Sequence, residues 1–168
     1  MRVTFTRTAE RRYRVSVEGP GVVSSWMEPA PGYDSRLPHD MAHFVVENEL
    51  GITGGVFGQL ASGGDSSTFH PTDNRVRRKL AKRGHRIAAT NRDDSLLSER
   101  LVYLVWQMWT NDQIGDNSPV KGVSVDDLNR VCLKFEAVSA VWSKLEVGEA
   151  MTLDWTVGAG RPGRRRHR

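Results

Sequence analysis

A chain of 168 residues is long enough for one domain with a hydrophobic core and short for two. Its hydrophobic content of 38% and charged content of 26% are ordinary for a globular protein, and the absence of a long apolar run excludes a membrane-spanning helix. The formal charge of +4 belongs to the C-terminus, because residues 161–168 hold five arginines and residues 1–160 carry −1.

The cysteine content and the N-terminus bear on the compartment. Cys132 is the single cysteine, which excludes an internal disulfide and a cysteine-rich zinc site. Residues 1–7 alternate polar and apolar side chains and lack the apolar stretch of a signal peptide. These features favour the cytoplasm.

Three segments alternate polar and apolar residues and are predicted to be strands. They are residues 2–7, 11–18 and 150–157. The short link between the first two indicates an antiparallel hairpin, which the third strand is expected to join. Residues 19–36, rich in Gly and Pro, are expected to form a loop.

Four segments are predicted to be helical. The first begins at Pro38 and stops near Gly51, and a Gly-rich stretch with a short packed turn follows it over residues 51–64. The other three are a basic helix over 74–86, an apolar helix from Asp93 or Asp94 to about Thr110, and a helix from a capping box at Ser124 and Asp127 to Gly148. The apolar helix, hydrophobic on nearly every side, is expected to be the central buried one.

The fold class that follows is α+β, with a small antiparallel sheet packed against a layer of about four helices. Residues 1–157 are expected to form a single domain. Residues 158–168 are expected to be a disordered basic tail, since Gly, Pro and Arg there offer no apolar surface to bury.

The feature that most directly suggests a chemical function is His39-Asp40-x-x-His43 on the first predicted helix. Side chains four apart lie on one face of a helix, with Cβ atoms roughly 6 Å apart, so two imidazoles can reach one metal ion. The helix dipole disfavours the imidazolium form of His39, and neutral imidazole is the form that binds metal. The alternative reading is two partly buried histidines bonded to backbone.

Asp40 is the candidate general base for a metal-bound water, and Glu47 is the candidate third ligand. As an acid in the first turn, Asp40 also has a purely structural explanation in the helix dipole. Glu47 can share an ion with His43, but His39 and Glu47 lie about 12 Å apart along a regular helix axis. His70 and Glu99 are therefore alternative third ligands.

Residues 37–43 resemble two kinds of metal-binding helix. One is the HExxH zinc peptidases, from which this chain differs by Asp40 in place of Glu. The other is the ubiquinone-biosynthesis family whose zinc motif is HDxxH followed, after eleven residues, by Glu. His39, Asp40 and His43 match that motif, whereas Gly55 stands at the expected Glu position. The resemblance implies a divalent metal such as zinc.

The first functional hypothesis is therefore a metal-dependent enzyme, a hydrolase or lyase assisted by zinc. The second is a non-enzymatic protein that binds nucleic acid or an acidic partner through the basic helix 74–86 and the Arg-rich tail. No aromatic residue is interleaved in residues 74–92 to stack on a base. The basic residues expected to make that contact are Arg75, Arg78, Lys79, Lys82 and Arg83.

Overall fold

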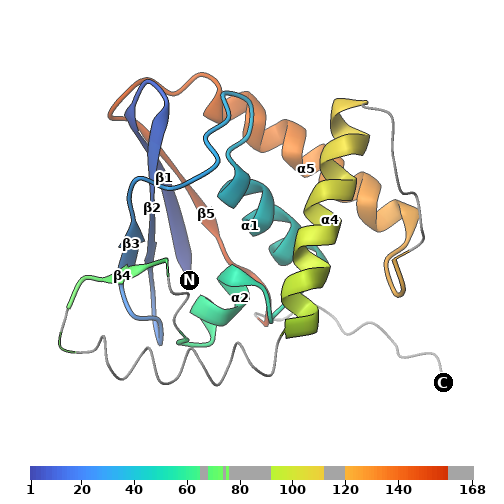
Figure 1. Ribbon diagram of the computed structural model, residues 1–168, viewed down its shortest axis with the longest axis horizontal. Coiled ribbons are helices and arrows are strands. Elements are labelled where there is room, and N and C mark those ends of the chain that lie inside the picture. The colour runs from blue at the N-terminus through green and yellow to red at the C-terminus, as the bar shows by residue number, and fades with distance from the viewer. Residues whose placement is uncertain (65–67, 74, 76–91, 112–119, 159–168) are drawn as a thin grey trace.

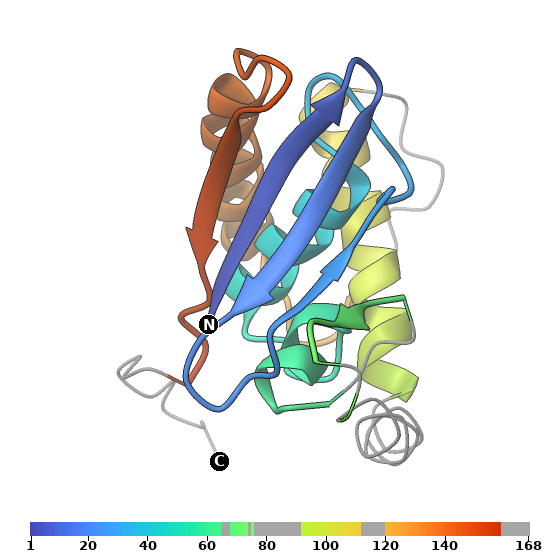
Figure 2. The same cartoon turned by 90° about the vertical axis from the view of Figure 1, so that its left-hand side faces the viewer.

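The computed structural model describes residues 1–64, 68–73, 75, 92–111 and 120–158. Within these residues an antiparallel sheet lies on one side and helices α1, α2, α4 and α5 lie on the other (Figures 1 and 2). The α+β prediction is confirmed.

The sheet is built around the N-terminal hairpin. Strand β1 (Arg2–Ala9) pairs antiparallel with β2 (Arg12–Glu18) on one side and with β5 (Ala150–Asp154) on the other, as predicted. The alternation of the sequence is reproduced in the burial, because Val3 and Phe5 are fully buried and Thr4 and Thr6 between them are not. One face of the sheet therefore carries the core.

Two further short strands extend the sheet within the stretch expected to be a loop and beyond it. Strand β3 (Ser25–Met27) pairs with β2, and β4 (His70–Pro71) pairs with β3, giving the order β4-β3-β2-β1-β5. The prediction that residues 19–36 form only a loop was wrong at 25–27. A strand of three residues has too few alternating positions to be recognised from its pattern.

The first two helices are consecutive in the chain. Helix α1 (His39–Leu50) follows Pro38 and ends at Gly51, whose φ of 73° is left-handed. Helix α2 (Val56–Ala61) occupies the Gly-rich stretch, where a packed turn was expected.

The remaining described helices are α4 (Arg92–Thr110) and α5 (Val125–Trp142). Helix α5 begins with the predicted capping box, in which Ser124 and Asp127 each accept from the other's backbone N–H. It ends at Trp142, short of the expected end near Gly148.

The central helix is α1, not α4 as the sequence suggested. Residues 41–48 are all buried, whereas Leu96 and Tyr103 of α4 are 62% and 57% exposed. Helix α1 contacts α2, α4 and α5 (Figure 1). Its Phe44 packs its ring against Phe5 of the sheet. Covered from both sides, α1 buries three polar residues, His43, Glu47 and Asn48.

Among the described helices none is long and apolar enough to cross a bilayer. The predicted basic helix, apart from Arg75, and residues 159–168 of the predicted tail lie outside the described residues.

Candidate metal centre

The loop before α1 fixes the position of His39. Its backbone N–H donates to the Gly32 carbonyl at 3.0 Å, and a Cβ on Gly32 would lie 2.6 Å from the His39 Cβ. Gly32 also has a φ of 69°, which favours glycine. Just beyond it, the Asp34 carboxylate accepts from the backbone N–H groups of Arg36 and Leu37. The entry to the helix is thereby held in one conformation.

His43 lies one turn after His39 on the same face of α1, as the spacing predicts. The two ring centroids are 4.5 Å apart and the rings are inclined by 64°. His39 is exposed at the start of the helix, whereas His43 is only 4% exposed. Of the two histidines, only His43 therefore faces the interior.

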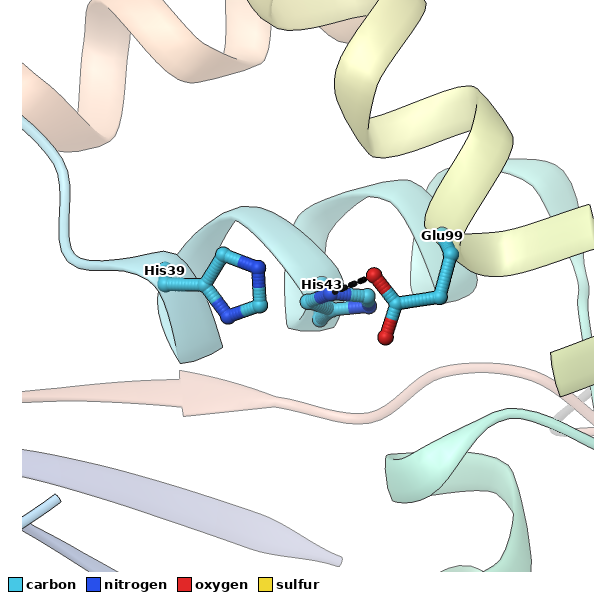
Figure 3. A group of neighbouring side chains, drawn as sticks. All are labelled: His39, His43 and Glu99. Atoms are coloured by element: carbon cyan, nitrogen blue, oxygen red, sulfur yellow. Dashed lines mark ion pairs between the residues drawn. The ribbon is translucent and has the colours of Figure 1, made fainter. Parts of the chain in front are cut away.

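Glu99 approaches the two histidines from α4 (Figure 3). Its Oε2 lies 3.4 Å from His43 Nε2. One ligand atom from each of His39, His43 and Glu99 lies within 4.8 Å of the other two, so the three can hold a metal ion. Glu99 was one of the alternative third ligands named from the sequence, and α4 brings it to the position that the helix geometry denies to Glu47.

A chain of hydrogen bonds lies behind His43, on its Nδ1 side. Nδ1 is 3.0 Å from Ser98 Oγ, and the Ser98 hydroxyl donates to Glu47 Oε1 at 3.0 Å. Ser98 and Glu99 are consecutive on α4, so this helix contacts both nitrogens of one imidazole. Ser98 was missed from the sequence, because nothing in its local pattern distinguishes it from the other serines.

Glu47 caps the start of α2. Its carboxylate accepts from the backbone N–H groups of Val56, Phe57 and Gly58 at 2.9, 2.8 and 3.2 Å. A Cβ on Gly55 would lie 2.2 Å from the Glu47 carboxyl carbon, so glycine is needed there for the carboxylate to approach. The carboxylate of Glu47 therefore lies where a side chain at position 55 would extend.

The protonation of these groups is governed by their burial. Burial lowers the pKa of His43 to about 4, so its imidazole is neutral at pH 7. Burial raises the pKa of Glu47 to about 7, and the hydrogen bonds from Ser98 and from the N–H groups of α2 oppose that rise. The donors around Glu47 all suit an acceptor, so we treat it as a carboxylate.

The network assigns the tautomer of His43. The Ser98 hydroxyl has one proton, which it donates to Glu47, so its oxygen accepts a proton from Nδ1. Nε2 then carries the lone pair. This nitrogen is buried and has no hydrogen-bond partner among the described residues. Nε2 lies 3.4 Å from the Glu99 carboxylate, which is also an acceptor, and a cation between the two would satisfy both.

Asp40 lies away from this network. It bonds to the hydroxyl of Tyr13, which also lies 2.5 Å from the Pro31 carbonyl oxygen. Burial raises the pKa of Asp40, and it raises that of Tyr13 together with the charge of Asp40. The contact with Tyr13 ties the start of α1 to strand β2. Its proposed role as general base stays a prediction.

The remaining candidate, His70, is on the short strand β4. Its ring packs against Trp26 of β3 at 5.3 Å between centroids, and it is not part of the group formed by His39, His43 and Glu99.

A pocket of about 450 Å³ opens beside the candidate centre. It lies between the loop before α1 and helix α4. His39 and Glu99 belong to its wall, and the rest of the wall is Gly32, Tyr33, Asp34, Leu37, Val102, Tyr103 and Trp106. Its volume is within the range of roughly 300–1,000 Å³ of small-molecule sites.

Comparisons with known proteins leave the site to be interpreted from its own chemistry. No family model, no curated protein and no solved structure matches the chain. The class supported by the fold is an α+β protein with two histidines and a glutamate gathered beside a pocket.

Proposed function

We propose that this chain is a metal-dependent enzyme, a hydrolase or lyase that uses one zinc ion held by His39, His43 and Glu99. The observation that carries the proposal is His43 Nε2, a buried nitrogen without a hydrogen-bond partner that faces a carboxylate. Two imidazoles and one carboxylate form a ligand set used by catalytic zinc sites, which leave the fourth position open.

The geometry of the three side chains is compatible with such an ion. Zinc–ligand bonds of about 2.0–2.1 Å place the ligand atoms within roughly 4 Å of one another. The present separation of up to 4.8 Å closes with small rotations of the two exposed side chains, His39 and Glu99. His43 needs no adjustment, because Ser98 and Glu47 already hold its ring and tautomer.

We propose supporting roles for Asp40 and Glu47, which are not among the three proposed ligands. Zinc in such a site supplies a Lewis acid and lowers the pKa of a bound water toward 7. Asp40 remains the proposed general base, because it is adjacent to His39 in the chain and burial raises its pKa, and in this role its carboxylate would exchange the hydrogen bond with Tyr13 for one with the bound water. Glu47, the third ligand first considered, receives four hydrogen bonds, so we assign it to orienting His43 through Ser98.

Elemental analysis of tag-free protein, purified without added metal and then dialysed against zinc, tests the proposal. We expect one zinc ion per chain, abolished by His43→Ala and retained by the control His70→Ala, whose imidazole packs on Trp26. Asp40→Asn should retain zinc and lower the rate of p-nitrophenyl acetate hydrolysis, since an amide cannot take a proton from water. No stoichiometric zinc in the wild type would overturn the proposal.

The second hypothesis from the sequence concerned nucleic acid or an acidic partner. It rests on the basic helix 74–86 and the Arg-rich tail, which, apart from Arg75 and Gly158, lie outside the described residues, and it remains an expectation.

A further inference from the structure

The pocket beside the candidate centre has a wall that is unusual in its combination of side chains. Leu37 and Val102 are buried and supply an aliphatic floor. Tyr33, Tyr103 and Trp106 supply aromatic rings. Such a wall favours an apolar ring-sized group, because burying apolar surface is the main source of affinity in small-molecule pockets.

The charged groups of that wall are both acidic. Asp34 and Glu99 line the pocket, and among the described residues no lysine or arginine does. The Asp34 carboxylate is held in place by the N–H groups of Arg36 and Leu37. A negatively charged group placed among these carboxylates would be repelled, whereas a cation would be attracted both by the carboxylates and by the aromatic faces.

Two arginines that contact or flank residues of the wall, Arg7 of β1 and Arg36 of the loop before α1, make their own contacts outside the pocket. Arg7 donates to the carbonyl of Leu145 at 2.5 Å and to the Tyr33 hydroxyl at 2.9 Å. The Arg36 guanidinium stacks 4.1 Å above the ring of Trp109. Neither side chain lines the pocket, so neither offers a binding partner to an anion inside it.

From this combination we infer that the pocket binds the body of the substrate, an apolar ring-containing group that is positively charged or neutral and not anionic. The inference rests on the proposed function for one detail: a carbonyl attached to that body would reach the group formed by His39, His43 and Glu99. The preference for the body itself depends on the wall alone, and in zinc-loaded protein its charge preference depends on Asp34, because a bound zinc ion would offset the charge of Glu99.

Ligands of one shape and three charges test the preference without metal. Benzamidine, benzamide and benzoate are titrated into metal-free protein, and dissociation constants are measured by NMR chemical-shift perturbation. We expect benzamidine to bind tightest, at least about tenfold more tightly than benzoate, with benzamide between them, as about 1.4 kcal/mol of charge discrimination requires. Equal binding of the three, or tightest binding of benzoate, would overturn the inference.

Two pairs of variants locate the binding. Trp106→Ala should weaken benzamidine at least about fivefold, whereas Leu96→Ala, an exposed apolar side chain on the same helix outside the pocket wall, should not. Asp34→Asn keeps an oxygen for the N–H groups of Arg36 and Leu37 and should narrow the gap between benzamidine and benzoate. Equal effects of the two α4 variants, or an unchanged gap in the Asp34 variant, would contradict the inference.

A final arm separates this inference from the proposed function. In zinc-loaded protein, benzohydroxamate should bind at least about tenfold more tightly than acetohydroxamate, because only the former places a ring in the pocket. Protein that takes up no zinc but retains the benzamidine preference refutes the proposed enzyme and leaves the pocket inference standing. Protein that takes up zinc but does not distinguish the two hydroxamates refutes the pocket inference alone.

Discussion

The two nitrogens of His43 face regions that are built in opposite ways. On the Nδ1 side, Ser98, Glu47 and the start of α2 form a closed chain in which each donor has an acceptor. On the Nε2 side lies Glu99, which is 64% exposed and is itself part of the pocket wall, and Nε2 has no hydrogen-bond partner among the described residues. The residues on the Nδ1 side orient the imidazole, whereas those on the Nε2 side leave its lone pair available to a ligand. A satisfied network behind an unsatisfied nitrogen is the arrangement expected of a ligand-binding histidine.

The largest expected effect on stability comes from removing Glu47, the acceptor on the Nδ1 side of His43. Glu47→Ala leaves the Ser98 hydroxyl and three N–H groups of α2 without their acceptor and should cost about 3–5 kcal/mol of unfolding free energy. Glu99→Ala, on the open side, should cost less than about 1 kcal/mol. Urea denaturation of metal-free protein compares the two. Equal losses of unfolding free energy in Glu47→Ala and Glu99→Ala would contradict the difference between the Nδ1 and Nε2 sides of His43.

The second prediction concerns the pH dependence of stability in metal-free protein. The pKa of His43 falls from 6.5 to about 4 on folding, so the unfolded chain binds more protons and His43 stabilises the fold increasingly as pH rises from 4 to 6.5. The pKa of Glu47 rises from 4.5 to about 7, so its contribution is lost as pH rises through that window. The two dependences oppose each other in the wild type.

Replacing either His43 or Glu47 should reveal the pH dependence of stability that the other residue causes. Relative to wild type, His43→Gln should lose stability as pH increases from 4 to 6.5, by up to about 3 kcal/mol at 1.36 kcal/mol per pKa unit. Glu47→Gln should gain stability relative to wild type as pH increases from 4.5 to 7. Urea midpoints measured at half-unit pH steps would show these slopes. Parallel pH profiles for all three proteins would mean that neither group is shifted by its burial.

A smaller effect on folding than that of Glu47→Ala is expected at Ser98, which links Glu47 to His43. Ser98→Ala should cost about 1–2 kcal/mol, because Glu47 keeps its three backbone donors. Its effect on zinc should be larger, about 10–100-fold weaker binding, since nothing then selects the tautomer with its lone pair on Nε2. Competition with a chelator measures this affinity. Unchanged zinc binding in Ser98→Ala would show that the hydrogen bonds at Nδ1 of His43 do not support metal binding at its Nε2.

The sequence predicted the parts of this picture that depend on local periodicity. Alternation located β1, β2 and β5, and the four-residue step placed His39 and His43 on one face of α1. The sequence also named Glu99 among three possible third ligands. It could not choose among them, because the choice depends on how α4 packs against α1.

The rest depended on contacts between segments distant in the chain. The apolar character of α4 suggested a central position, but α1 takes that position because the sheet covers one side of it and α4 and α5 the other. Glu47 appeared from its spacing to be a ligand, and only the fold shows that its carboxylate caps α2. The glycine at position 55 marked a departure from the HDxxH motif, and its physical reason is the room that it leaves for Glu47.

The most direct measurement of the central claim is X-ray absorption spectroscopy at the zinc edge of zinc-loaded protein. A shell of two imidazole nitrogens and one carboxylate oxygen at about 2.0–2.1 Å, reduced to one imidazole in His39→Ala, is the predicted result. Zinc surrounded by oxygen alone, or the same shell in His39→Ala and wild type, would contradict the assignment of His39, His43 and Glu99 as the ligands.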